Sequence, residues 1–326
     1  PWAGMDRNGR IPKVSLPEGI EHPERWRYIP EGRIKPGNVF QRLLVSSFIV
    51  PYVFRDGDVG TGFGLGLTDI DFRLKRRREF LGLQSYRYFD AYLPLVEIEW
   101  VLPFDAVGRL IIDSVAIFGD EYQRTVERSF KERWIDVYEN EGKRSGAFSA
   151  GVYGVHPYML LNYADTLNDA FTVAHEMGHT MHTVLSHESQ PFATSDYSIF
   201  VAEVASMANE SFFLDRLLVE ETDPARRVTL LQHAIDDIAA GFYRQAMFAD
   251  FELRAHRIVE SDRPITAEVL QETYLEVLGS FFADSLDDQP WYRNTWARIP
   301  HFYGSPYYVF QYATSKAAAV LIHRRM

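Results

Sequence analysis

The 326-residue chain contains no cysteine, which excludes disulfide bonds and any zinc site built from thiolates. Positive charge is also scarce, because 34 Lys and Arg stand against 45 Asp and Glu, and a net charge of −11 argues against nucleic-acid binding. No run is long enough to span a bilayer, since the most apolar one, residues 43–54, is interrupted by Pro51. The sequence shows no signal-peptide pattern, so we expect a cytoplasmic, soluble protein.

Two regions of the chain differ in their hydrophobic period. Up to about residue 73 the sequence is rich in Pro and Gly, and residues 62–72 alternate with the period of two that is typical of a strand. Asp56 and Gly57, which precede this run, favour a hairpin turn. Beyond the change of period, apolar residues recur at helical spacing. We therefore expect a β-rich segment at residues 1–75 and a mainly α-helical domain at residues 76–326.

The second region predicts a series of helices. Asp165 or Thr166 is placed to cap one of them, and Asp223 followed by Pro224 is typical of another helix start. Residues 145–163 break the pattern with glycines, aromatics and β-branched side chains, which predicts a short hairpin or an edge strand. The expected helices cover residues 104–117, 122–138, 166–185, 199–220, 224–260, 266–282 and 307–323.

One of these helices carries an HExxH motif. His175 and His179 are four residues apart, so both imidazoles project from one helix face and can bind one metal ion. Glu176, beside the first histidine, can act as a general base toward a water that the metal activates. The alternative is a core helix whose histidines bond to backbone or carboxylate groups. With no thiolate available, histidines and carboxylates are the ligands that remain for zinc.

The next expected helix supplies candidates for a third ligand. Glu203 and Glu210 are seven residues apart on a mostly apolar helix, where carboxylates are costly unless they are paired or bound to a cation. Glu203 as a metal ligand and Glu210 as the acceptor for a ligand histidine would satisfy both. The alternative is that both are ordinary surface carboxylates. His182 shares the histidine face, and we expect it to pack beside the ligands or hydrogen-bond to one of them.

Five stretches in collinear order carry a pattern far more specific than HExxH. Through them the chain, from about residue 80 to its end, resembles the oligoendopeptidase F branch of the M3 (thimet-like) metallopeptidases. The resemblance implies a zincin-type, mainly α metallopeptidase domain with a short β element, and a deep channel that admits short, unstructured peptides. The stretches are RWIDVYENEGKRSGAFSAGVYGVHPYMLLNY, DTLNDAFTVAHEMGHTMH, QPFATSDYSIFVAEVASMANE, FYRQAMFADFE and ARIPHFYGSPYYVFQYATSKAA.

The resemblance also implies roles for individual residues. Zinc is expected to be held by His175, His179 and Glu203, with Glu176 as the general base of a metalloendopeptidase that cleaves peptides. This assignment agrees with the spacing of the same residues. The natural peptide length, the cleavage-site preference and the oligomeric state do not follow from it.

Two further features are expected from the same resemblance. A His and Tyr pair in the family stabilises the oxyanion of the tetrahedral intermediate, and His301 and Tyr308 are the first choices for it. Tyr307 and Tyr312 stay open as alternatives, because spacing does not select one tyrosine. Residues 151–158 are expected to form the edge strand that pairs with the substrate backbone.

The chain also departs from the family pattern. A long helical segment that family members carry before residue 80 is absent, and the chain stops inside the expected closing helices, so we expect a domain that is truncated relative to the family. Residues 1–75 instead resemble a segment of bacterial outer-membrane surface-antigen proteins. Two alternatives to a peptidase therefore follow: an inactive fragment or fusion that binds zinc or peptide without turnover, and a surface-binding protein defined by residues 1–75.

Overall fold

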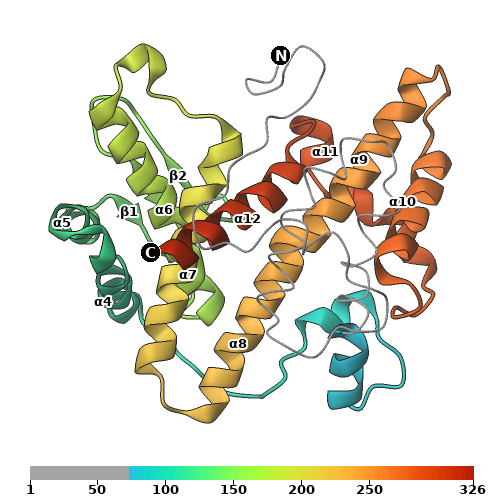
Figure 1. The fold of residues 1–326 in the computed structure, drawn as a ribbon, viewed down its shortest axis with the longest axis horizontal. Coiled ribbons are helices and arrows are strands. Elements are labelled where there is room, and N and C mark those ends of the chain that lie inside the picture. The colour runs from blue at the N-terminus through green and yellow to red at the C-terminus, as the bar shows by residue number, and fades with distance from the viewer. Residues whose placement is uncertain (1–72) are drawn as a thin grey trace, which may run out of the picture. The chain divides into compact units, whose positions relative to one another are not determined.

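The computed structural model describes residues 73–326, and this part of the chain is mainly helical (Figure 1). A first helix covers residues 73–80. The remaining α-helices are α4 (Phe104–Ser114), α5 (Asp120–Lys131), α6 (Leu167–Ser189), α7 (Ile199–Glu220), α8 (Pro224–Ile238), α9 (Arg244–Glu260), α10 (Ala267–Phe282), α11 (His301–Gly304) and α12 (Val309–Arg325). Short 3-10 turns lie at Tyr88–Tyr92, Ala116–Phe118, Phe192–Thr194 and Pro290–Arg298. The predicted mainly α fold is confirmed.

Most of the expected helix positions are confirmed, and two are corrected. The helix predicted over 122–138 ends at Lys131, because Arg133 adopts a left-handed φ of 62° that stops it. The helix predicted over 224–260 is divided into α8 and α9 by one π-helical turn at Ala239–Tyr243. The β-rich segment, its hairpin and its boundary lie outside the described residues, except that residues 73–75 belong to the first helix.

Three short strands form a small sheet in the order β1-β3-β2. The strands β2 (Phe148–Ala150) and β3 (Tyr158–Leu160) pair antiparallel, as the hairpin prediction requires, and β1 (Ile135–Asp136) pairs parallel with β3. The expected edge strand at residues 151–158 is wrong. Residues 151–157 form the connection between the two strands, and Gly154 has the left-handed φ of 88° that such a turn requires. The edge on this side of the sheet is β2.

Local sequence signals set two helix starts. Thr166 caps α6, since its hydroxyl accepts a hydrogen bond from the Asp169 amide (3.1 Å) while the Asp169 carboxylate accepts one from the Thr166 amide (3.2 Å). Asp223 caps α8 through a 2.9 Å bond from the Arg226 amide, and Pro224 occupies the first turn, as predicted. The Thr166 cap fixes the start of α6, the helix that carries the HExxH motif.

The main hydrophobic core surrounds α6. Side chains of α4, α5, β3, α7 and α8 pack against it, and α12 packs against α7 as well (Figure 1). A helix that is buried on most sides has an apolar sequence around most of its circumference. The core residues on α6 are Ala170, Phe171, Val173, Ala174, Met177 and Met181.

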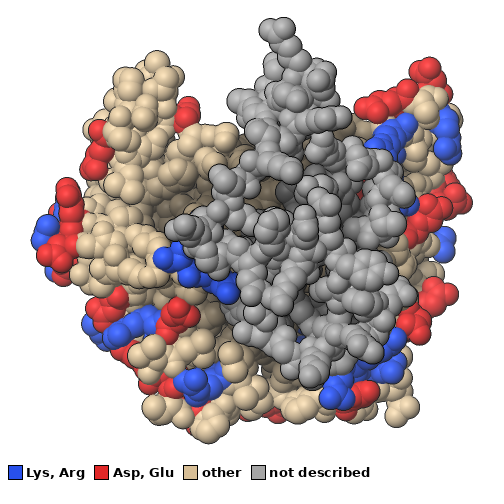
Figure 2. Space-filling model, in the orientation of Figure 1, with Lys and Arg blue, Asp and Glu red and all other residues tan. Residues whose placement is uncertain are grey.

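The described surface has mixed charge. On the face shown in Figure 2, basic and acidic side chains of the described residues alternate, with no large patch of one sign among them. Among residues 73–326, no helix combines the length and the apolar character that crossing a membrane requires.

Candidate metal centre

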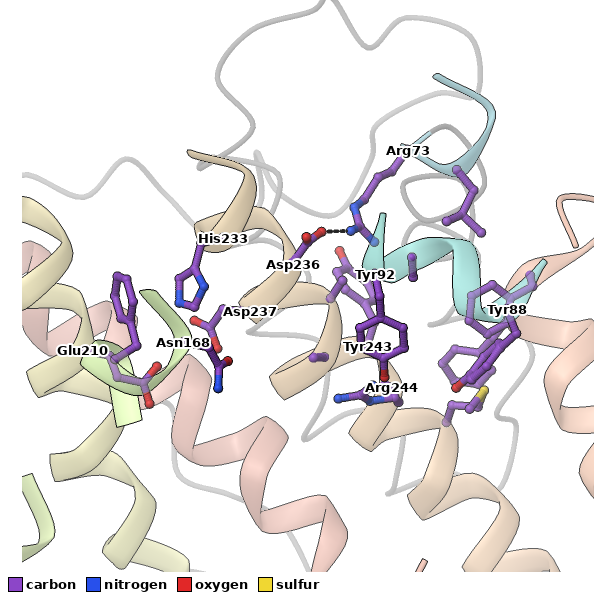
Figure 3. A pocket seen from close by; sticks show the side chains of 18 of the residues that line it. Arg73, Tyr88, Tyr92, Asn168, Glu210, His233, Asp236, Asp237, Tyr243 and Arg244 are labelled. Carbon is purple, nitrogen blue, oxygen red and sulfur yellow. Dashed lines mark hydrogen bonds and ion pairs between the residues drawn. The ribbon is translucent and has the colours of Figure 1, made fainter. Parts of the chain in front are cut away.

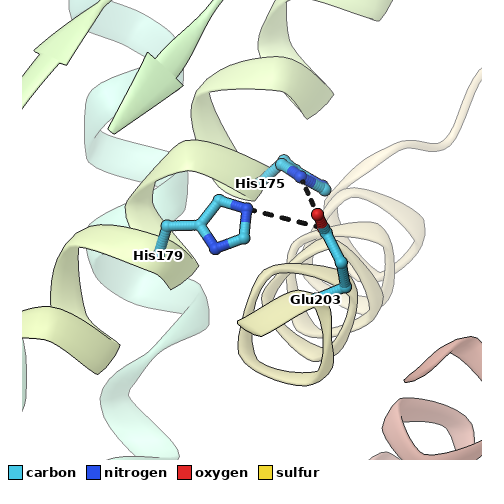
Figure 4. A group of neighbouring side chains, drawn as sticks. All are labelled: His175, His179 and Glu203. Atoms are coloured by element: carbon cyan, nitrogen blue, oxygen red, sulfur yellow. Dashed lines mark ion pairs between the residues drawn. The ribbon is translucent and has the colours of Figure 1, made fainter. Parts of the chain in front are cut away.

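The two histidines of the motif and Glu203 converge on one point (Figure 4). His175 and His179 project from the same face of α6, and their ring centroids lie 4.9 Å apart. Glu203 projects toward them from α7, with its Oε2 3.3 Å from His175 Nε2 and 3.5 Å from His179 Nε2. One donor atom from each of the three residues lies within 4.8 Å of the other two. The alternative that Glu203 is a surface carboxylate is wrong, since it is buried.

These distances fit a metal ion better than direct hydrogen bonds. A charge-assisted N–H to carboxylate bond is usually about 2.7–2.9 Å long. Two ligand atoms that each lie about 2.0–2.1 Å from a tetrahedral zinc ion are separated by about 3.3 Å. The distances from Glu203 to the two imidazoles match that separation. The donor set of two imidazole nitrogens and one carboxylate oxygen is also one that zinc accepts, so the residues present fit this ion.

A glycine brings the two ligand-bearing helices together. A Cβ atom at Gly178 would lie 2.5 Å from the Cα of Ser206, so α6 and α7 can approach this closely only without a side chain there. Asn209 adds a hydrogen bond between the same helices, from its Nδ2 to the Ala174 carbonyl at 2.6 Å. This close approach sets the position of Glu203 relative to the histidines.

The charges of the ligand residues depend on each other. Burial alone would raise the pKa of Glu203, but the two imidazoles hold it well below its usual value. Burial alone would lower the pKa of His175, but the carboxylates of Glu203 and Glu210 raise it well above its usual value. Ser206 donates a 3.1 Å hydrogen bond to Glu203 Oε2 and helps to orient it. The Glu203 carboxylate therefore stays ionised, and a metal ion that binds here has to displace the proton of His175, because a ligand imidazole is neutral.

A chain of charged groups with little exposure to solvent extends behind His175. Its Nδ1 contacts Glu210 Oε1, which agrees with the predicted acceptor role of Glu210. Lys316 of α12, buried at 4% exposure, lies 3.8 Å from Glu210 Oε2 and forms an ion pair with Asp237 of α8. Burial, together with the charge of Glu210, raises the pKa of Asp237 to about 6. Sequence reasoning missed Lys316 and Asp237, although a lysine within the small-residue stretch of α12 was a usable signal.

Glu176 lies beside the ligands and outside their group. Its side chain is buried and lines a cavity next to the site. Burial raises the pKa of Glu176, while the two imidazoles and the Ser149 backbone amide act in the opposite direction. A buried carboxylate with a raised pKa, next to a candidate metal site, has the properties of a general base.

The candidate oxyanion residues come from the start of α11, from the turn before α12 and from α12 itself. The Tyr308 hydroxyl donates to Glu203 Oε1 at 3.3 Å, and the Tyr312 hydroxyl lies 3.5 Å from His301 Nε2. The ring centroids of His301 and Tyr308 are 5.1 Å apart. Tyr307 differs, because its φ of 57° turns it away to pack on His256 at 4.5 Å. The structure thus groups His301, Tyr308 and Tyr312 near the metal ligands.

His182 has a packing role. Its ring stacks on Tyr197 with 3.7 Å between the ring centroids and 13° between the planes. The Tyr197 hydroxyl in turn lies 2.8 Å from Thr183 Oγ1. His182 is therefore not part of the His175, His179 and Glu203 group, and it supports the segment that precedes α7.

A cavity of about 660 Å³ adjoins the metal centre. It extends from His175 and Glu176 to aromatic residues between the first helix and α4, and to the junction of α8 and α9. A concave site of this size next to a metal centre can enclose part of a small organic ligand. Figure 3 shows its lining side chains, with Glu210, His233, Asp237 and Asn168 at one end and Tyr88, Tyr92, Tyr243 and Arg244 at the other.

The chain matches a known family over most of its length. The family described as Peptidase family M3 matches residues 103–325. The group B oligopeptidase PepB of Streptococcus agalactiae is 40% identical over 253 residues, and an oligoendopeptidase F homolog of Borreliella burgdorferi is 43% identical over 251 residues. These alignments cover 78% and 76% of this chain, and 42% of each relative.

Solved structures agree with this result. A putative peptidase from Chlamydophila abortus, 35% identical in sequence, superposes with a TM-score of 0.65 over 85% of this chain and 44% of its own. The chain thus spans about two fifths of the length of the curated relatives that it matches. The family match covers α4 to α12, which include both ligand-bearing helices. The chain therefore belongs to peptidase family M3, and its relatives within that family include an oligopeptidase and an oligoendopeptidase F homolog.

Proposed function

We propose that this chain is a zinc-dependent endopeptidase that hydrolyses short, unstructured peptides. One observation carries the proposal: two imidazoles and a carboxylate converge on one point, and the buried Glu176 lines the cavity beside them. His175, His179 and Glu203 would hold the zinc ion, and three protein ligands are typical of a catalytic rather than a structural site. Zinc bound there would lower the pKa of water and polarise the scissile carbonyl.

Glu176 moves the proton in this proposal. It accepts a proton from the attacking water as the water oxygen bonds to the carbonyl carbon, and it returns a proton to the amide nitrogen as the C–N bond breaks. Burial raises the pKa of its carboxyl group toward neutrality, so the same group can accept the proton and release it within one cycle. Glu176 is not needed for metal binding.

His301 and Tyr308 stabilise the negative charge that develops on the carbonyl oxygen. The Tyr308 hydroxyl already donates to a ligand carboxylate, over a long distance of 3.3 Å, and can turn to a nearby oxyanion. Tyr312 is the alternative donor, because its hydroxyl is close to His301. One donor of this kind is worth about 3 kcal/mol in the transition state.

The test is metal content combined with cleavage of a quenched fluorescent peptide. The full chain should bind one zinc ion and cleave the peptide. The variant Glu176→Gln should keep the zinc and lose turnover by at least about 100-fold, because it removes the general base. Glu188→Gln, an exposed change on the same helix, is the matched control and should leave both readouts unchanged. Near-normal cleavage by Glu176→Gln would contradict the mechanism.

A second function follows from the length of the match. Because the chain spans about two fifths of its relatives, a fragment that binds zinc and peptide without turnover is the alternative. One zinc ion bound per chain, with binding of a labelled peptide but without cleavage, supports this second function. Zinc-dependent cleavage excludes it.

A further inference from the structure

The charged groups that line the cavity are almost all neutralised within the protein. Asp236 forms an ion pair with Arg73 (Figure 3), and Asp237 forms one with Lys316. Glu210 contacts both His175 and Lys316. The charged side chains that line the cavity are Arg73, Glu176, Glu210, Asp236, Asp237 and Arg244. Glu176 is the proposed proton acceptor. Arg244 is then the charged group of the cavity that, in the described part of the chain, has neither a partner nor an assigned role.

Arg244 opens helix α9, directly after the π-helical turn. Within residues 73–326 its guanidinium has no hydrogen-bond acceptor and no carboxylate partner, although the side chain is only partly exposed. Burial raises the pKa of the Tyr88 hydroxyl, and the positive charge of Arg244 acts to lower it. A cation that is partly withdrawn from water without a counter-charge is unfavourable, so a bound anion would stabilise this end of the cavity.

The position of Arg244 separates it from the metal centre. Figure 3 shows it beside Tyr243, at a distance from the end of the cavity formed by Glu210 and Asp237. The adjoining wall is aromatic, since Tyr88 lies at this end and packs on Phe282, which also lines the cavity. The cavity thus has a reacting end with acidic groups and a distant end with one unpaired cation. A ligand that reaches from one end to the other would carry its negative charge at the distant end.

We propose that Arg244 binds a carboxylate of the peptide substrate and so sets which peptides are cleaved efficiently. This inference rests on the proposed peptidase function, because it takes the ligand in the cavity to be a peptide. Carboxylates are the anions that an unmodified peptide carries, either at its C-terminus or on Asp and Glu side chains. The planar guanidinium accommodates a carboxylate through two parallel hydrogen bonds, which a lysine in the same place does not reproduce.

The experiment compares matched peptides on the full chain. One pair differs only in a C-terminal carboxylate or amide, and a second set replaces each position in turn with Asp or Asn. We expect kcat/KM to favour one carboxylate over its neutral counterpart by at least about tenfold, the effect of one charged hydrogen-bonded pair. A difference within the first pair shows that Arg244 binds the C-terminal carboxylate. A difference within the second set shows that it binds the carboxylate of an Asp side chain.

Variants then assign that preference to one residue. Arg244→Gln should abolish the preference, so that kcat/KM becomes equal for the charged and the neutral peptide, and Arg244→Lys should retain only part of it. Arg257→Gln, an exposed change on the same helix, is the control and should keep the full preference. Melting curves identify a variant that fails to fold. If Arg244→Gln does not fold, the proposal is judged from Arg244→Lys and from the kcat/KM ratios of the wild-type protein.

Binding separates this inference from the proposed function. The Kd of labelled acid and amide peptides is measured in the Glu176→Gln background, where no turnover is required. If the chain cleaves nothing but still binds the acid peptide more tightly through Arg244, the inference stands and the peptidase proposal fails. If wild-type protein treats every charged and neutral pair alike, or if Arg244→Gln keeps the preference, the carboxylate site is overturned.

Discussion

Replacing Lys316 by methionine should destabilise the protein more than any exposed lysine change. Lys316 is 4% exposed and is shared by two carboxylates that are only partly exposed, Asp237 and Glu210. Methionine preserves the apolar stem and removes the charge, so both carboxylates lose their buried cation. Loss of one partner from a buried ion pair costs about 3–5 kcal/mol, which for a domain of this size lowers the melting temperature by about 6–10 °C.

The assay is thermal unfolding followed by circular dichroism, with Lys131→Met as the matched control. Lys131 pairs with Glu127 at the surface, where such pairs contribute little, so its removal should shift the melting temperature by less than about 2 °C. The deficit of Lys316→Met should shrink from pH 8 to pH 5.5, because Asp237, with a pKa already raised to about 6, becomes neutral by taking up a proton. Equal stability of the two variants would refute the reasoning.

Three further predictions follow from the described contacts. Gly178→Ala should cost about 3 kcal/mol and weaken zinc binding, because the added methyl group pushes α6 from α7; urea unfolding and zinc titration measure both. Glu210→Gln should weaken zinc binding about 10- to 100-fold by loosening His175, and competition with a chelator measures the change. Asp90→Asn should destabilise the protein at pH 7, and this penalty should shrink as the pH is lowered. Hydrogen bonds from Arg87 lower the pKa of Asp90 against the effect of burial, so its contribution is lost as the pH falls through that lowered pKa.

The metal centre could be predicted from sequence where local periodicity determines the geometry. His175 and His179 share a helix face by spacing alone, and the carboxylates of Glu203 and Glu210 were conspicuous on an apolar helix. Lys316 could not be found in this way, because its partners lie on α7 and α8 and the contact depends on how α12 crosses them. Contacts between elements distant in sequence leave no periodic signal.

The fold shows the same division between local and distant determinants. The start of α8 followed from Asp223 and its proline, which act within one helical turn. The end of α5 did not, because it depends on the left-handed conformation of Arg133, after which Trp134 is buried. Sequence spacing also did not select which tyrosine before or within α12 is the oxyanion donor. The structure disfavours Tyr307, because its φ places the side chain on His256.

The contribution of α12 to the metal centre has a consequence for biosynthesis. Tyr308 contacts a ligand carboxylate from just before this helix, and Lys316 supports the ligand layer from within it. A ribosome synthesises His175 and Glu203 well before it reaches these residues, so the nascent chain carries the metal donors while their supporting groups are still untranslated. Tight metal capture is therefore expected only after α12 has emerged, and premature termination before this helix yields a chain that competes poorly for zinc in the cell.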